Sequence, residues 1–342
     1  MKKKLIRYDF WMDPAFQAVI DDFGELETAI VGPALEPAQA DALIATAHIY
    51  HVSPAKDEIP KSFQVDSSFL ARAPNLVCVS SGGAGHDTVD VAACTEAGVL
   101  VVNQAGCNAQ SVAEMTIGMM IAASRRIVES HVALVSGLTP SREYFMGHDI
   151  SGKTLGVVGI GHIGTKVAHL AKAFGMTVLA YDPLLDAEDI LARGAMPVDF
   201  DTLCATADVV SLHCPRNETT LGMFDADAFS RMKKGAIFVS TARGGIHSEA
   251  DLYDALVSRH LGSAALDVWD VEPPLPDSGL LQLANVIATY HTSGVSHEAR
   301  RSVAVNGAQQ IVRLFRGETP RRLVNPQVLD RALGRLRDLA AC

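Results

Sequence analysis

Residues 154–183, TLGVVGIGHIGTKVAHLAKAFGMTVLAYDP, constrain the fold of this chain more than any other stretch. Gly159, Gly161 and Gly164 have GxGxxG spacing between an apolar run and an amphipathic helical pattern, and Asp182 ends the next apolar run. The first glycine permits a tight turn, the second lets the backbone approach a pyrophosphate, and the third lets helix and strand pack closely. Such turns also serve packing alone or methyltransferase sites, but the strand, turn, helix, strand, acid order favours a dinucleotide-binding unit.

The acidic residue after the second strand indicates which dinucleotide binds. Asp182 can accept hydrogen bonds from both ribose hydroxyls and would repel a 2′-phosphate, and residues 183–185 contain no arginine. NAD is therefore favoured over NADP as the cofactor. The helix N-terminus after the turn would face the phosphates. We expect cofactor contacts from Gly159, Gly161, His162, Ile163, Gly164 and Asp182.

Short apolar or β-branched runs recur from residue 155 onward. They span residues 155–160, 176–182, 207–214, 235–241, 263–268 and 285–290. These runs do not alternate between apolar and polar residues, which is typical of a parallel sheet buried by helices on both faces. The pattern predicts a doubly wound α/β domain.

Helix signals lie between and around these runs. Ser248 with Asp251 three residues later predicts an N-cap, and Gly262 is expected to end that helix. Earlier, Asp87 is expected as an N-cap and Gly98 as a stop, so the first hundred residues also read as α/β. Two long helices are expected over residues 108–134 and 296–317, and residues 53–68 read as a surface loop.

Composition limits the classes of function. The formal net charge of −10 and the absence of a basic stripe argue against nucleic-acid or acidic-membrane binding. No run approaches eighteen uncharged apolar residues, and Arg7, Asp9 and Asp13 interrupt any signal-like segment. The six cysteines form no CxxC pair or zinc-like pattern, so we expect reduced thiols, no metal and a cytoplasmic protein.

Charged residues beyond three strand ends suggest a chemical site. Arg243, Glu272 and His291 follow the runs ending at 241, 268 and 290, and ligands of open α/β sheets bind at that edge. An arginine there is commonly a surface residue, but two glycines follow this one, and a guanidinium matches a carboxylate bidentately. Hydride transfer to a carbonyl needs a proton donor and an orienting group. A histidine held by a glutamate, with an arginine, supplies both.

Taken together, the motifs resemble the D-isomer-specific 2-hydroxyacid dehydrogenase family over nearly the whole chain. The carrying segments are SSGGAGHDTVDVAACTEAGVLVVN, the GxGxxG with Asp182, HCP, TARGGI, ALDVWDVEPP and His291. The resemblance implies a Rossmann NAD-binding domain, residues 108–296, inserted into a discontinuous flavodoxin-like α/β substrate domain of residues 1–107 and 297–342. It also implies a cleft between the domains and a homodimer formed through the helix after residue 108. The expected activity is NAD-dependent interconversion of a D-2-hydroxy acid and its 2-keto acid.

The resemblance further implies roles for single residues. His291 would be the acid and base toward the substrate C2 oxygen, Glu272 would support it, and Arg243 would bind the carboxylate and carbonyl. Asp267 would contact the nicotinamide amide, and backbone amides of the 82–85 loop would contact the substrate carboxylate. Residues expected at the cofactor also include His213, Pro215, Thr241 and Gly294, and those expected at the substrate include Gly83 and Ala84 with Arg243 and His291.

Some positions depart from the family pattern. Ser240 stands where asparagine is usual, Ser248 where aspartate is usual, and Tyr290 where proline is usual; we expect the two serines to alter support of the loop rather than the chemistry. Arginines that the family's phosphoglycerate dehydrogenases carry are replaced by Ser80 and Ser81 and by the 45–51 segment, which argues against phosphate recognition. His48, Tyr50 and His51 are candidates to face the substrate, although ordinary structural roles are commoner.

Two other functions fit parts of the pattern. An NAD(H)-sensing binding protein, like the family's corepressors, would retain the same residues, but no appended tail or basic patch favours it. A formate dehydrogenase would have glutamine at the position of Glu272. A panel of 2-keto acids assayed with NADH separates an enzyme from a binding protein.

Overall fold

The structure, a computed structural model, describes residues 3–341. The chain forms two compact units. The central unit is Ala109–Ser296, and the terminal unit combines the chain up to Asn108 with the chain from His297 onward. The path of the chain therefore makes the central unit an insertion in the terminal one.

The central unit is built on one parallel sheet, with strand order β12-β11-β10-β9-β6-β7-β8. The strands are β6 (Thr154–Val158), β7 (Thr177–Tyr181), β8 (Met196–Pro197), β9 (Val209–Leu212), β10 (Ile237–Ser240), β11 (Ser263–Leu266) and β12 (Val286–Ala288). All predicted apolar runs after residue 155 are confirmed as strands, while the short β8 was not predicted. The order reverses direction between β6 and β9, as in dinucleotide-binding folds.

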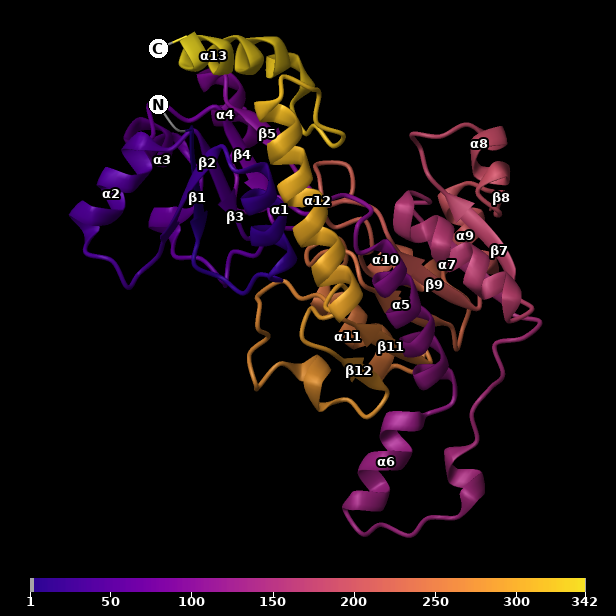
Figure 1. Cartoon of the computed structure of the whole chain (residues 1–342). Helices are drawn as coiled ribbons and strands as arrows, with labels where there is room; N and C mark the ends of the chain where they lie inside the picture. The colour runs from indigo at the N-terminus through magenta and orange to yellow at the C-terminus, as the bar shows by residue number, and fades with distance from the viewer. Residues whose placement is uncertain (1–2, 342) are drawn as a thin grey trace. The chain divides into compact units, whose positions relative to one another are not determined.

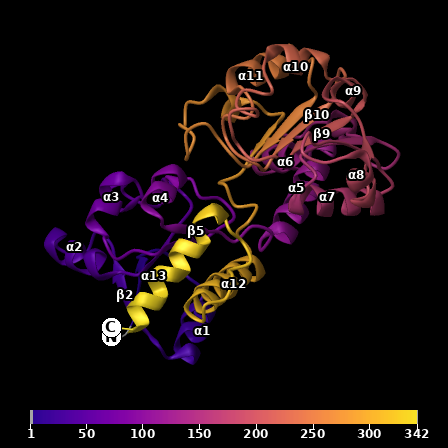
Figure 2. The ribbon, with the colours of Figure 1, turned by 90° about the horizontal axis from the view of Figure 1, so that it is seen from above.

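Helices cover both faces of this sheet (Figure 2). They are α5 (Ala109–Ser124), α6 (Ile127–Val135), α7 (His162–Ala173), α8 (Ala187–Ala192), α9 (Phe200–Thr206), α10 (Ala226–Arg231) and α11 (Glu249–Val257), with 3-10 turns η2 (Arg142–Phe145) and η3 (Gly279–Gln282). One apolar core joins α9, α10 and α11 to the sheet, and a second joins α5 and α7 to its other face. The doubly wound arrangement is thus confirmed.

The terminal unit has its own parallel sheet, with strand order β2-β1-β3-β4-β5. Its strands are β1 (Lys3–Tyr8), β2 (Leu26–Val31), β3 (Ile49–Val52), β4 (Cys78–Ser81) and β5 (Leu100–Val102). This is the flavodoxin-like order, which reverses between β1 and β3. The predicted fold class, a Rossmann domain inserted into a flavodoxin-like one, is confirmed.

Helices also cover both faces of the terminal sheet (Figure 1). They are α1 (Ala15–Phe23), α2 (Pro37–Thr46), α3 (Ser67–Arg72), α4 (Val91–Ala97), α12 (His297–Phe315) and α13 (Leu329–Ala341), with 3-10 turns η1 (Lys61–Phe63) and η4 (Pro326–Val328). One face packs against α1, α12 and α13 and the other against α2, α3 and α4. The predicted long helix over 296–317 is α12.

Two predicted helix ends are confirmed and two are wrong. Ser248 accepts a hydrogen bond from the Asp251 amide at the start of α11, and Gly98 ends α4 in a left-handed conformation. The N-cap of α4 is Asp90, which accepts from the Ala93 amide, rather than Asp87. Helix α11 ends at Val257, so Gly262 does not end it but instead precedes β11.

The predicted helix over 108–134 is interrupted, and the predicted loop over 53–68 is partly ordered. Helices α5 and α6 are separated at Arg126, which has a φ of 52°. Within 53–68, η1 forms and α3 begins, and the side chains of Ile59 and Val65 are buried in the core. The apolar pattern of residues 108–134 could not show whether they form one helix or two, because the break depends on the backbone conformation of one residue, Arg126.

Candidate active site

The GxGxxG turn joins β6 to α7, and a side chain at each of its three glycines would meet different surroundings. Gly159 has a φ of 87°, and a Cβ there would lie 2.7 Å from the Cys214 amide nitrogen. A Cβ on Gly164 would overlap the carbonyl oxygen of Gly159, so this glycine lets α7 lie against the turn. A Cβ on Gly161 would meet nothing within 4 Å. The open side of the turn at Gly161 fits the approach of a pyrophosphate.

The start of α7 adjoins the open side of the glycine turn. Its N-cap, Gly161, offers no side chain to the first amides of the helix, and His162 and Ile163 begin the helix. Unpaired amides at a helix N-terminus attract anions. The arrangement therefore fits the phosphates of NAD on backbone groups alone.

Asp182 lies directly after β7, beside the glycine turn. Its carboxylate accepts from the amides of Ile160, at 3.0 Å, and Leu184, at 3.1 Å. A carboxylate has further lone pairs for ribose hydroxyls. Arg193, eleven residues after Asp182, was not predicted from the sequence. Its guanidinium donates to the Ile160 carbonyl at 2.8 Å. Asp182 therefore holds the turn through the Ile160 amide, and Arg193 holds it through the Ile160 carbonyl.

The segment after β9 approaches the glycine turn from the neighbouring strand. The Nε2 atom of His213 lies 2.9 Å from the Ser211 hydroxyl, and its buried Nδ1 has no hydrogen-bond partner among residues 3–341. Burial lowers the pKa of His213 to about 3, so the ring is neutral. Pro215 follows on the surface, its carbonyl accepting from Thr220. Directly after β10, the next strand in the sheet, the hydroxyl of Thr241 lies 3.0 Å from that of Thr116.

Arg243, Glu272 and His291 follow three adjacent strands, β10, β11 and β12, at the carboxyl edge of the sheet. The structure brings them together, since Nδ1 of His291 lies 2.8 Å from Oε2 of Glu272. Arg243 is close enough that its charge acts on the Glu272 carboxylate. Its guanidinium also donates to the Ala242 carbonyl at 2.7 Å.

Glu272 is half-buried and ionised in this setting. Burial raises the pKa of its carboxyl, but the hydrogen bond and charge of His291, the Trp269 amide and the charge of Arg243 together leave it below the ordinary value. A carboxylate can only accept, so Nδ1 of His291 carries the proton of the shared bond. The Nε2 atom of the imidazole is left as the group that can exchange a proton with a ligand.

Asp267 is fully buried and holds the segment around His291. Its carboxylate accepts from the Thr289 hydroxyl at 2.6 Å and from the amides of Thr292 and Ser293, each at 2.8 Å. The Ser293 hydroxyl also donates to it. These bonds lie on both sides of His291, which has a left-handed φ of 51°. A non-glycine residue in that region costs roughly 1–2 kcal/mol, so surrounding bonds must hold it there.

The glycines after Arg243 allow close contact between two loops. A Cβ on Gly244 would overlap the Trp269 carbonyl oxygen, and Gly245 has a φ of 79°. The Gly245 amide donates to Asp270 at 2.6 Å. The loop bearing Arg243 is therefore packed and bonded to the loop bearing Glu272. Gly294, another predicted cofactor contact, follows Ser293 in the segment that Asp267 holds.

The predicted substrate loop lies in the terminal unit, after β4. A Cβ on Gly83 would lie 2.6 Å from the Pro54 ring. The carbonyls of Gly83 and Ala84 accept from the Gln104 amide and the Asn103 side chain, both at 2.8 Å. In a trans peptide the next N–H points the opposite way. The amides of Ala84 and Gly85 thus face away from Asn103 and Gln104, as donors to a ligand would.

Three candidates for substrate contact are instead buried residues in or directly before β3. His48 precedes β3, at the end opposite to the glycine loop, and its Nδ1 accepts from the Lys4 amide at 2.9 Å. Tyr50 is buried and donates to the Phe63 carbonyl at 3.0 Å. His51 is buried, with Nδ1 3.0 Å from the Ser80 hydroxyl. Their environments are structural.

The two serine departures differ in their surroundings. Ser248 caps α11, which agrees with a role in supporting the loop after Arg243. The hydroxyl of Ser240 is buried without a hydrogen-bond partner in the described part of the chain.

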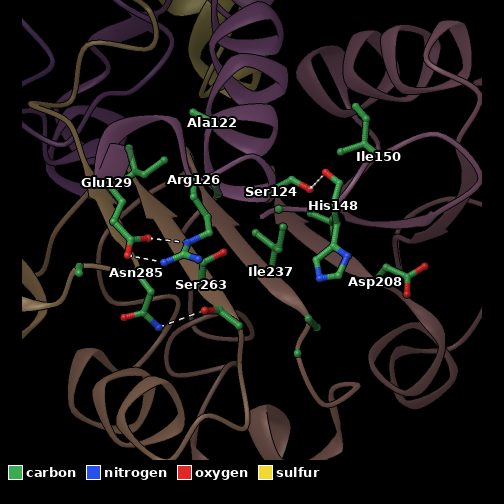
Figure 3. A pocket seen from close by; sticks show the side chains of 18 of the residues that line it. Ala122, Ser124, Arg126, Glu129, His148, Ile150, Asp208, Ile237, Ser263 and Asn285 are labelled. Carbon is green, nitrogen blue, oxygen red and sulfur yellow. Dashed lines mark hydrogen bonds and ion pairs between the residues drawn. The ribbon is translucent and has the colours of Figure 1, made fainter. Parts of the chain in front are cut away.

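A cavity of about 730 Å³ lies at the other edge of the central sheet. It is lined by residues at the amino ends of strands, including Ile237, Ser263 and Asn285, and by residues near α6, including Arg126 and Glu129 (Figure 3). Arg126 and Glu129 form an ion pair of 2.6 Å there. None of the predicted catalytic or cofactor residues lines this cavity, so it is separate from the candidate active site.

Comparison with known proteins shows which families of protein the chain is similar to. A family model described as "D-isomer specific 2-hydroxyacid dehydrogenase, NAD binding domain" matches residues 117–293. D-3-phosphoglycerate dehydrogenase of Archaeoglobus fulgidus is 42% identical over 77% of this chain and 50% of its own. Hydroxypyruvate reductase of Thermotoga maritima is 38% identical over 72% of this chain and 80% of its own. The chain spans about half the length of the phosphoglycerate dehydrogenases that it matches.

Solved structures show the same architecture. A glyoxylate reductase from Paecilomyes thermophila has a TM-score of 0.83 and 25% identity, covering 96% of this chain and 100% of its own. Within residues 3–341, no helix combines the length and apolar character needed to cross a bilayer.

Proposed function

Because the chain belongs to the D-isomer-specific 2-hydroxyacid dehydrogenase family, we propose that it is an NAD-dependent oxidoreductase interconverting a D-2-hydroxy acid and its 2-keto acid. One observation carries the proposal. The His291–Glu272 pair, at 2.8 Å, and Arg243, whose charge acts on Glu272, follow adjacent strands at the carboxyl edge of the sheet that also carries the glycine turn. A proton donor, its ionised partner and a cation are what reduction of a charged keto acid requires.

Each residue has one task in this mechanism. Arg243 binds the substrate carboxylate and orients the carbonyl, because a guanidinium forms two parallel bonds to such groups. His291 gives a proton to the C2 oxygen through Nε2, and Glu272 stabilises the imidazolium through Nδ1. NADH, when bound, supplies the hydride to C2. In the oxidative direction His291 takes the proton back.

The function is tested by NADH oxidation with a panel of 2-keto acids, followed by absorbance. We expect steady-state turnover with at least one unphosphorylated member. Tight NADH binding with no turnover on any 2-keto acid would contradict the enzyme and favour an NAD(H)-sensing protein.

We propose a substrate without a phosphate group. The Ser80 hydroxyl lies 3.0 Å from Nδ1 of His51, and Ser81 donates to the Gly85 carbonyl at 2.6 Å, so both hydroxyls already have partners within the protein. Neither position offers the charge that a phosphate needs. Within the panel, hydroxypyruvate should therefore have a higher kcat/KM than its phosphorylated analogue, and the reverse order would refute this part of the proposal.

NAD is expected to be preferred over NADP because of the charge of Asp182. The variant Asp182→Asn keeps an oxygen that can accept from the Ile160 amide but removes the repulsion of a 2′-phosphate. We expect the ratio of kcat/KM for NADH to that for NADPH to fall by about tenfold, equivalent to about 1.4 kcal/mol. Asp182→Ala, which also loses the amide bond, should weaken both cofactors further. A wild-type enzyme that prefers NADPH would contradict the role of Asp182.

A homodimer formed through the segment after α5 is also proposed. Helix α6 and residues 136–149 project from the central unit (Figure 1) and expose Leu134, Val135, Leu138 and Met146, each by more than 60%. Apolar surface of this kind is typical of an interface. The double variant Leu134→Glu, Val135→Glu should convert a two-chain mass in light scattering to a one-chain mass. Leu191→Glu, an exposed change on α8, is the matched control, and an unchanged mass in the double variant would refute this interface.

The cytoplasm is the proposed compartment. The cysteines Cys78, Cys94, Cys107, Cys204 and Cys214 are free thiols. Free thiols are typical of proteins in reducing compartments. Because these thiols are free, we do not expect a mild reductant to change the stability of the fold.

A further inference from the structure

Trp269 is the point at which the three catalytic loops meet. It lies three residues after the end of β11, and its side chain is only 3% exposed, within the core that includes Phe229 and Phe238. Core packing explains the burial of the indole ring. It does not explain the two hydrogen bonds that residue 269 donates, one from its backbone amide to Glu272 and one from its indole N–H to the segment before His291.

The first bond orients Glu272. The backbone amide of Trp269 donates to Oε1 of Glu272 at 3.1 Å, while Oε2 accepts from Nδ1 of His291 at 2.8 Å. One oxygen of the carboxylate is thereby fixed by the backbone, which directs the other toward the imidazole.

The second bond orients the segment that carries His291. The indole Nε1 of Trp269 donates to the Thr289 carbonyl at 3.1 Å, two residues before His291. Tyr290, between them, is 72% exposed, so burial of its ring does not hold the segment. Asp267 holds the Thr289 side chain and the residues after His291. The indole holds the backbone on the near side.

The third contact reaches the loop of Arg243. The carbonyl of Trp269 occupies the space where a Cβ of Gly244 would lie. The position of residue 269 is therefore linked to the loops after β10, β11 and β12.

We propose that Trp269 is a positioning residue, whose indole N–H sets the backbone before His291 so that the imidazole meets the carboxylate that the Trp269 amide has oriented. The proposal deepens the proposed function and rests on it for its kinetic consequence. It assigns no direct contact with substrate or cofactor to Trp269.

The test compares Trp269→Phe with Phe229→Leu in the full chain. Phenylalanine keeps an aromatic ring and the backbone amide but loses the indole donor. Phe229 is buried in the same core and has no bond to the pair, so its variant reports a packing loss alone. We expect Trp269→Phe to lower kcat about tenfold, as for a loss of orientation at the reacting centre, with the Kd for NADH unchanged by calorimetry. Phe229→Leu should lower the melting temperature at least as much but change kcat less than twofold.

A double-mutant cycle decides whether the indole acts through His291. In a His291→Gln background, Trp269→Phe should change the residual kcat less than twofold, because coupled residues are not additive. An equal fold-loss in both backgrounds would overturn the proposal, as would wild-type kcat in Trp269→Phe.

A spectroscopic readout keeps the test independent of activity. The Nδ1 proton shared with Glu272 should give a low-field proton NMR signal, assigned by its absence from His291→Gln. Trp269→Phe should broaden or remove this signal, and Phe229→Leu should retain it. An unchanged signal in Trp269→Phe would refute the positioning role. Absence of turnover in the wild type would refute the proposed function instead.

Discussion

Replacement of His291 by glutamine is expected to remove most turnover while leaving NADH binding intact. The structure places the imidazole on the Glu272 carboxylate with Nε2 free to exchange a proton. Loss of a general acid and base commonly lowers the rate by about 10²–10⁴-fold. The glycine turn and Asp182 lie after other strands and are untouched by the change. The measurements are kcat on the best 2-keto acid and the Kd for NADH by calorimetry.

Glu272→Gln serves as the matched variant for this prediction. Its amide oxygen can still accept from Nδ1 of His291, but the charge that stabilises an imidazolium is gone. Turnover should therefore lie between that of the wild type and that of His291→Gln. Near-normal kcat in His291→Gln would remove His291 from the proposed chemistry.

Replacement of Arg243 by alanine is expected to damage substrate binding and the chemical step together. A cation that pairs with the carboxylate also holds the carbonyl in place, so its loss should raise KM and lower kcat. Truncating one partner of such a pair costs about 3 kcal/mol, or roughly two hundredfold in kcat/KM. The same change removes a charge that lowers the pKa of Glu272.

Arg243→Lys is the matched control for the guanidinium geometry. Lysine keeps the charge but not the planar pair of donors, so we expect intermediate kinetics and unchanged affinity for NADH. If Arg243→Ala had wild-type KM and kcat on every 2-keto acid tested, the carboxylate clamp would be wrong.

Local signals in the sequence were reliable where the physical cause was itself local. The strands of the central sheet were predicted because burial on both faces leaves an uninterrupted apolar run. Ser248 was predicted as a cap because the bond from the Asp251 amide spans three residues. Asp87 was predicted as the N-cap of α4, but only the backbone path shows that Asp90 is the acid that reaches the first amides of the helix.

Long-range contacts account for the predictions that were wrong or absent. The break between α5 and α6 occurs at Arg126, whose side chain bonds to Glu129 and to the Tyr144 carbonyl, eighteen residues away. His51 was considered for the substrate, yet it pairs with Ser80 from a neighbouring strand. The roles of Arg193 and Trp269 were not apparent, because each depends on a carbonyl from a distant segment.

The sequence by itself determined the class of fold and the dinucleotide turn, and it predicted Arg243, Glu272 and His291 as the catalytic residues. Spacing and residue chemistry along one strand or one turn are sufficient for the fold class and the turn, whereas the prediction of the three side chains also rests on the family resemblance. Only the tertiary structure decided how the three side chains meet, because they follow separate strands that become neighbours in the folded sheet. The left-handed backbone of His291 is held by Asp267 and Trp269 from another strand end. Hydrogen bonds between strand ends leave no periodic mark along the chain, and so they become visible only when the sheet has formed.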